Sequence, residues 1–192
     1  MFKKTLLATA TTAALLGPVA AFAAGDFGNG TITFTGSVIE APCSISAADT
    51  NMTIDMGQVS KKDLTATGKF STSVPINIHM TGCTFDADPA PPAGTGNANG
   101  KLSKIGVTFQ GTSATPASGL LTNIGGAANV VVQLLNKDNN TPIKIGAAPT
   151  AADAQQMTAG NGVLNFFARL MATGVGGAGS INSTATYSLT YF

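Results

Sequence analysis

Two cysteines, one histidine and a few acidic side chains are the residues of this 192-residue chain that could carry chemistry. Cys43 and Cys83 could form a disulfide, act as thiol nucleophiles or bind a metal ion. A structural zinc site takes four protein ligands, and His79 is the only imidazole that could join the two thiols. His79 lies in a strand pattern, where we expect a half-buried or surface position. The sequence therefore predicts no metal site.

Two other patterns have the residue types of known catalytic or phosphate-binding sites, but the segments around them do not fit such sites. Asp86 and Asp88 could be the carboxylate pair of a glycosidase, but they lie in a low-complexity loop of Pro, Gly, Ala and Asn over 86–101. Residues 174–179 match G-x-G-x-x-G, but a strand pattern follows where phosphate binding needs a helix. We therefore predict no catalytic residue, no cofactor and no enzyme.

The first 23 residues have the pattern of a secretory signal peptide. Lys3 and Lys4 precede an apolar run that ends in an A-x-A site at 21–23, so we expect cleavage after Ala23. The remaining 192 − 23 = 169 residues carry 10 − 2 = 8 basic and 9 acidic side chains, a net charge of −1. This balance excludes a basic nucleic-acid surface, and no later apolar run is long enough for stable membrane insertion. In an exported chain the two cysteines are expected to form a disulfide.

Few charges cover the surface, because Asp, Glu, Lys and Arg make up only 10% of the chain against the usual quarter. Such a surface repels neighbouring molecules weakly. It suits either a protein that packs against its own copies or a neutral secreted domain.

Short runs of β-forming residues, many of them alternating apolar with polar, predict a chain built from strands. The expected strands cover 31–34, 37–39, 52–56, 74–80, 105–110, 130–136, 143–145, 163–172 and 181–192. Clusters of Gly, Asn, Asp, Pro and Ser separate them, with a hairpin loop expected at 137–142 and one short helical turn within 151–157. This pattern predicts one all-β domain, a sandwich or a barrel.

The last twelve residues form the clearest of these patterns. Ile181, Ala185, Tyr187, Leu189 and Tyr191 share one face, and mostly Thr, Ser and Asn share the other. A free chain end usually frays, so an aromatic strand at the end of the chain must dock on another part of the fold.

Several sequence segments together resemble one known family. They are N-G-T-I-T-F-T-G-S-V-I-E-A-P-C at 29–43, M-G-Q-V at 56–59, I-x-I followed by G-C within 76–83, N-F-F-A-R-L-M-A-T-G at 165–174 and A-T-Y-S-L-T-Y-F at the end. Combined with the signal peptide, they resemble the type 1-like fimbrial subunits, the chaperone–usher pilins of Gram-negative bacteria, over nearly the whole chain. Leu170 departs from the family, where many members have Tyr, and the loop 86–101 is longer than usual.

The resemblance implies an incomplete immunoglobulin-like sandwich that lacks its last strand and is completed by a donor strand from a neighbouring subunit. It divides the chain into a signal peptide at 1–23, a donor-strand extension at 24–36 and a pilin domain at 37–192. The implied donor residues are Gly30, Ile32 and Phe34 on one face, with Phe27 on the opposite parity.

The resemblance also implies a hydrophobic groove beside the C-terminal strand. The residues assigned to groove and strand are Phe166, Ala168, Leu170, Gly179, Ile181, Tyr187, Leu189, Tyr191 and Phe192, with 166–170 expected on the edge that faces the strand. The implied partners are identical or related pilin subunits, a periplasmic chaperone, which would also hold the terminal carboxylate, and an outer-membrane usher. The implied location is an extracellular fimbria.

Two alternatives remain beside a major fimbrial subunit. A minor or tip-adaptor pilin would share every motif above. A self-contained secreted carbohydrate-binding sandwich would use Tyr187 and Tyr191 to stack on sugar rings and would need no spare N-terminal strand.

Overall fold

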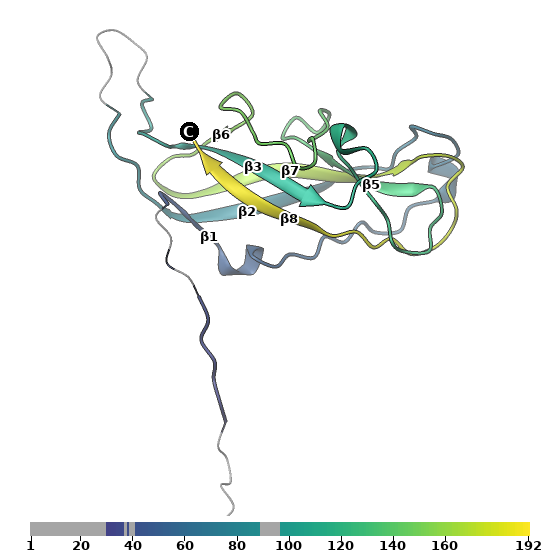
Figure 1. Cartoon of the computed structure of the whole chain (residues 1–192), viewed down its shortest axis with the longest axis horizontal. Helices are drawn as coiled ribbons and strands as arrows, with labels where there is room; N and C mark the ends of the chain where they lie inside the picture. The colour runs from purple at the N-terminus through teal and green to yellow at the C-terminus, as the bar shows by residue number, and fades with distance from the viewer. Residues whose placement is uncertain (1–29, 37, 39–40, 89–96) are drawn as a thin grey trace, which may run out of the picture. The chain divides into compact units, whose positions relative to one another are not determined.

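The computed structural model describes residues 30–36, 38, 41–88 and 97–192 (Figure 1). The chain divides into two units, Met1–Ile39 and Glu40–Phe192. The expected signal peptide and Phe27 lie outside the described residues. In the first unit, residues 30–36 belong to no helix or strand, and the side chains of Ile32 and Phe34 are 78% and 89% exposed.

The second unit is a two-sheet sandwich of antiparallel strands, which confirms the predicted all-β class (Figure 1). The strands are β1 (Ser44–Ile45), β2 (Val74–Cys83), β3 (Lys104–Gly111), β4 (Leu120–Leu121), β5 (Val130–Leu135), β6 (Gln155–Gln156), β7 (Gly160–Ala172) and β8 (Ala185–Tyr191). One sheet has the order β1-β2-β7-β5-β4, and the other has the order β6-β3-β8. Three short 3-10 helices, η1 (Ala47–Asp49), η2 (Lys61–Asp63) and η3 (Pro116–Ser118), lie between strands. In the described part of the chain no helix has the length and apolar character needed to span a membrane.

The core forms where the apolar faces of the two sheets meet. Alternation along β2 buries Ile76 and Ile78, which lie in register with Phe166 and Leu164 of β7. The ring of Phe109 on β3 meets the ring of Phe166 edge to face, with centroids 5.2 Å apart. Aromatic pairs of this geometry add about 0.5–1.5 kcal/mol beyond the area that they bury.

A disulfide joins Cys43 to Cys83, as predicted. The ladder between β2 and β7 shifts register between Met80 and Cys83, where one extra residue is inserted. Gly82 has a φ of 61°, a left-handed conformation that glycine adopts without a Cβ clash. Because of this bulge both Met80 and Cys83 point into the core, although alternation alone would place them on opposite faces.

Two predicted strands, at 31–34 and 143–145, are wrong, and residues 31–34 belong to no strand because they make no ladder with another described segment. Residues 143–145 form no strand, because Ile143 donates to the carbonyl of Leu134 but Ile145 donates to Pro116, which turns the chain away from β5. Residues 151–157 begin with one short turn, in which the N–H groups of Asp153 and Ala154 donate to the carbonyl of Thr150, and then form β6. The expected strand at 52–56 alternates in burial as predicted but pairs with no other strand among the described residues.

We expect the disulfide to be important for folding. It closes a loop across 40 residues of sequence, and chain-entropy reasoning gives such a cross-link ~4 kcal/mol. Cys43→Ser and Cys83→Ser should each lower the yield of folded protein, measured by periplasmic fractionation. Thiol labelling of the unreduced mature chain should be negligible and should reach two thiols only after reduction. Labelling of both thiols before reduction would contradict the disulfide.

Candidate functional site

A long groove runs along one side of the sandwich, between the C-terminal part of the chain and the segment that follows η1. Its volume is about 1160 Å³. One rim is residues 51–59 and the other is residues 177–185 with Tyr187, and Figure 1 shows the two running side by side. We call these the first rim and the second rim.

The floor of the groove is apolar. It is contributed by strands of both sheets and by neighbouring turns: Leu64, Ile76, Phe109, Leu121, Ala127, Val130, Val132, Leu134, Ala168 and Leu170. All ten residues are less than 10% exposed, so they belong to the core although they line the groove. Apolar side chains of an added strand could enter the groove and pack on this floor.

The first rim is extended and unpaired. Met52, Ile54 and Met56 are half-buried, whereas the residues between them are exposed, as in a strand with one face on a core. None of residues 51–59 makes a backbone-to-backbone hydrogen bond with another described residue. Apart from the Gly57 N–H, which donates to Asp55 Oδ1 at 2.8 Å, the backbone groups of this rim are open to pairing with an added strand.

The second rim is bound on one side only. β8 pairs with β3 from Ile105–Tyr191 to Gly111–Ala185, and in the described part of the chain no strand pairs with its other edge. Ahead of β8, the carbonyls of Ser180 and Asn182 accept backbone N–H groups from the loop 123–127. An edge strand of this kind presents a row of unpaired backbone groups.

Gly179 allows the second rim to lie against that loop. A Cβ at position 179 would collide with the backbone of Gly126 and Ala127. The side-chain oxygen of Asn123 accepts the N–H groups of Gly125 and Asn182, at 2.8 Å each, and so fixes the same junction.

Two tyrosine hydroxyls close one end of the groove. Tyr187 donates to the carbonyl of Asp49 at 2.8 Å, and Tyr191 donates to the carbonyl of Cys43 at 3.2 Å. Burial raises the pKa of both phenols, so the hydroxyls keep the protons that they donate. Because these bonds hold the segment from Cys43 to Asp49 against β8, Leu189 and Tyr191 do not line the groove.

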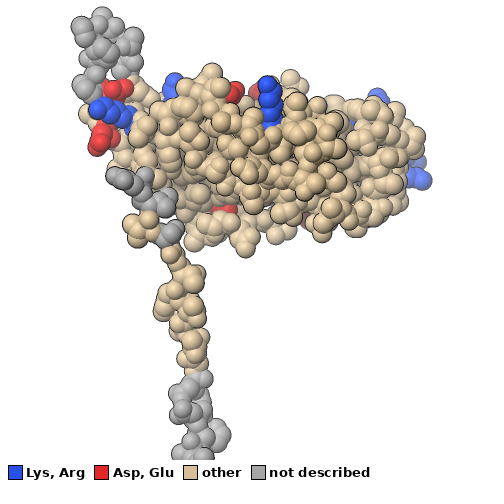
Figure 2. Space-filling model, viewed as in Figure 1, with Lys and Arg blue, Asp and Glu red and all other residues tan. Residues whose placement is uncertain are grey.

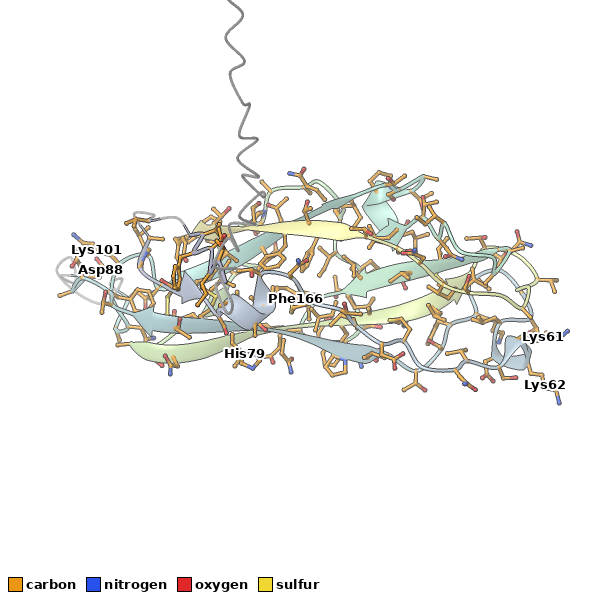
Figure 3. The ribbon with its side chains drawn as sticks, turned by 90° about the horizontal axis from the view of Figure 1, so that it is seen from below. Lys61, Lys62, His79, Asp88, Lys101 and Phe166 are labelled. Carbon is orange, nitrogen blue, oxygen red and sulfur yellow. A yellow bond between two sulfur atoms is a disulfide. The ribbon has the colours of Figure 1, made fainter. Side chains whose placement is uncertain are left out.

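The Asp49 side chain ties the same segment to the other sheet. Its Oδ2 accepts the backbone N–H of His79 at 2.6 Å and lies 2.8 Å from His79 Nδ1. The backbone hydrogen bond holds the pKa of Asp49 below its ordinary value, against the opposing effect of burial. His79, which Figure 3 labels, is 54% exposed through its side chain, in agreement with the surface position expected for it.

The structure places the predicted groove residues in three different settings. Ala168 and Leu170 lie in the floor, whereas Phe166 is packed between the sheets beyond the groove (Figure 3). The expectation that residues 166–170 form the facing edge is wrong, because β7 pairs with β2 on one side and β5 on the other. Gly179, Ile181 and Tyr187 line the second rim, and Phe192 extends the ladder by exchanging backbone hydrogen bonds with Lys104.

The first rim is the part of the site that the sequence prediction missed. Its signal was present, since the alternation of Met52, Ile54 and Met56 predicted a strand. A strand that pairs with no other described segment indicates where a strand from another molecule could bind. The alternating pattern alone does not show whether a strand has a partner.

Charged side chains are sparse on the face seen in Figure 2. Figure 3 shows Lys61 and Lys62 at one end of the domain and Asp88 and Lys101 at the other. Only Asp55 and Lys61 bring charge to the lining of the groove. Within the described residues no cluster of three His, Cys, Asp or Glu side chains could hold a metal ion. The groove is thus suited to an apolar, extended ligand.

The sequence matches the family model described as "Fimbrial protein" over residues 32–191. The F17 fimbrial protein of Escherichia coli is 34% identical over 168 residues, which cover 85% of this chain and 87% of that protein. The A chain of the type-1 fimbrial protein of Escherichia coli K12 is 31% identical over 197 residues, with 98% of each chain covered.

Solved structures are similar as well. A chain of a chaperone–usher pilus, in a study of rod uncoiling, aligns with a TM-score of 0.65 at 29% identity and covers 86% of this chain and 97% of that one. The P pilus rod subunit PapA aligns with a TM-score of 0.61 at 24% identity, over 79% of this chain and all of PapA, which shows a shared fold.

We expect Gly179→Ala to destabilise the second rim, because its Cβ would overlap backbone atoms that cannot swing aside. Overpacking of this kind costs roughly 1–3 kcal/mol. Gly126→Ala is the matched control, since a Cβ there meets the Ser180 hydroxyl oxygen at 3.8 Å, an ordinary contact. Thermal unfolding of the mature chain should show a lower midpoint for Gly179→Ala alone. Equal midpoints for the two variants would contradict the close approach at Gly179.

Proposed function

Because the chain belongs to the fimbrial protein family and is a structural fimbrial subunit with an immunoglobulin-like fold, we propose that its groove is filled by a β-strand from a neighbouring subunit. The observation that carries this proposal is the pair of rims above an apolar floor, the first without a backbone partner among the described residues and the second with one open strand edge. A single added strand would satisfy the backbone groups of both rims and would cover the floor at the same time.

The physical basis is β-strand addition, for which chaperone–pilin complexes are themselves a known case. Main-chain hydrogen bonds to the rims would give affinity, and alternate side chains would enter the groove. The ligand must therefore be extended and must carry apolar side chains at every second position.

The extension at 24–36 has these properties. Gly30, Ile32 and Phe34 share one parity, and threonines at 31 and 33 share the other. The side chains of Ile32 and Phe34 are highly exposed in this structure, and burying them in a groove would contribute roughly 3–6 kcal/mol. Residues 24–36 are our proposed donor strand, with Phe27 at its start on the other face.

Donor and groove are different surfaces of one chain, so each contact would be heterologous. A heterologous contact that does not close into a ring propagates, and identical or related subunits would assemble into a fibre. An extracellular fimbria of this kind uses the pilin as a structural element, which agrees with the structural role of the family.

An uncovered groove is an aggregation hazard before assembly. We propose that a periplasmic chaperone fills it with a strand of its own and holds the terminal carboxylate of Phe192, and that an outer-membrane usher exports the subunit. Phe192 is well placed for such capture, because its backbone continues the edge strand one residue beyond Tyr191.

The proposed donor strand is tested by arginine substitutions, one on the face that would enter the groove and one on the opposite face. Gly30→Arg would bring a cation into the apolar groove, which is unfavourable without a partner, so filaments should be lost while the domain stays folded. Thr33→Arg is the matched control, because a side chain at this parity would point away from the groove, and filaments should persist. Electron microscopy measures filaments, and circular dichroism measures the fold.

Normal filaments from Gly30→Arg, or from a chain that lacks residues 24–36, would reject the donor strand. That result would favour the self-contained carbohydrate-binding sandwich. Loss of filaments in both arginine variants would indicate that any charge in this segment is disruptive and that the assignment of faces is wrong.

A further inference from the structure

We propose that Met52 and Met56 are oxidation sites, and that their conversion to methionine sulfoxide by a peroxide or a hypohalous acid stops the groove from accepting a strand. The inference rests on the proposed function, in which the groove receives a donor strand. It adds a chemical modification of the first rim that would act on the subunit before assembly.

The methionines of the chain differ sharply in their surroundings. Met80 is 0% exposed and Met157 is 6% exposed, so both sulfur atoms are shielded within the fold. Met52 and Met56 are half-buried and line the groove. Met171 on β7 is also half-buried but does not line the groove, which makes it an internal comparison.

The first rim places the side chains of Met52 and Met56 in the lining of the groove, where the incoming strand would bind. Met52 and Met56 lie four residues apart on the same face of an extended segment, with Ile54 between them on that face. Because the backbone of residues 51–59 has no backbone partner among the described residues, only side-chain packing holds the rim on the floor. Both residues are only partly buried and line the groove, so reagents in solution can reach their side chains through it.

The chemistry is an oxygen-atom transfer. With hydrogen peroxide, a sulfur lone pair attacks one peroxide oxygen, the O–O bond breaks, an S=O bond forms and water leaves. Sulfur loses two electrons and the peroxide gains them. The product is a polar, chiral side chain in place of a flexible apolar one.

A sulfoxide would act directly on strand binding. The unmodified thioethers are polarisable and adapt their shape, which suits a rim that must fit against an incoming strand. A sulfoxide oxygen on the same face would be taken out of water by the donor side chains, and no hydrogen-bond donor of the apolar floor would compensate it. A groove that is already filled would instead shield both sulfur atoms, so assembled filaments would resist the same reagent.

The first test maps oxidation. The mature chain carrying Gly30→Arg serves as an assembly-blocked monomer, and wild-type filaments serve as the filled state. After a short treatment with hydrogen peroxide, peptide mass spectrometry should find sulfoxide at Met52 and Met56 at least ~10-fold more often in the monomer than in filaments, since reactivity follows exposure. Met171 should react equally in both, and Met80 and Met157 should react slowly. If Met52 were oxidised as slowly as Met80 in the monomer, the inference would be overturned.

The second test measures strand binding with a synthetic peptide of residues 24–36. Oxidation should weaken its binding to the Gly30→Arg chain by at least ~10-fold, which equals about 1.4 kcal/mol. Adding Met52→Leu and Met56→Leu together should make binding insensitive to peroxide, whereas Met171→Leu should leave the sensitivity unchanged. Equal binding before and after oxidation would overturn the inference alone. Failure of the peptide to bind the unoxidised chain would overturn the proposed function, and the inference with it.

Discussion

Unpaired backbone groups along two facing rims are the constraint on which the rest of this structure depends. β8 has a partner on one edge only, and residues 51–59 have no backbone partner among the described residues. Water can satisfy these groups, but it does not fill the groove above the apolar floor with apolar contacts. Only an extended chain with alternating apolar side chains meets both needs at once, and this requirement connects the fold to assembly.

Several local interactions keep the groove open and correctly spaced. The disulfide and the two tyrosine hydroxyls hold the segment from Cys43 to Asp49 against the sandwich, and Asp49 joins that segment to β2. At the other end, Gly179 lets the second rim approach the loop 123–127. The rims are therefore positioned before a strand arrives, and less binding free energy is lost in ordering them.

The sequence was sufficient to predict the features that depend on local pattern. Runs of β-forming residues predicted β2, β3, β5, β7 and β8, because a strand depends on residue types close together in the chain. The disulfide spans 40 residues and was predicted from export, since an oxidising compartment favours a bond between the two cysteines. The facing edge was predicted wrongly, since β7 has the same apolar pattern whether it lies at an edge or in the middle of a sheet. The two-residue strands β1, β4 and β6 are too short to leave a pattern, and the hydroxyl bonds of Tyr187 and Tyr191 join residues more than a hundred positions apart.

Amide hydrogen exchange on monomer and filament tests the central claim most directly. Exchange reports whether a backbone N–H is hydrogen-bonded, and the claim concerns the N–H groups of the two rims. The account predicts that residues 51–59 and the open edge of β8 exchange rapidly in the monomer and become protected in filaments. The central strands β2 and β7 should be protected in both, because their partners lie within the same chain. Rims that exchange equally fast in monomer and filament would show that no strand enters the groove.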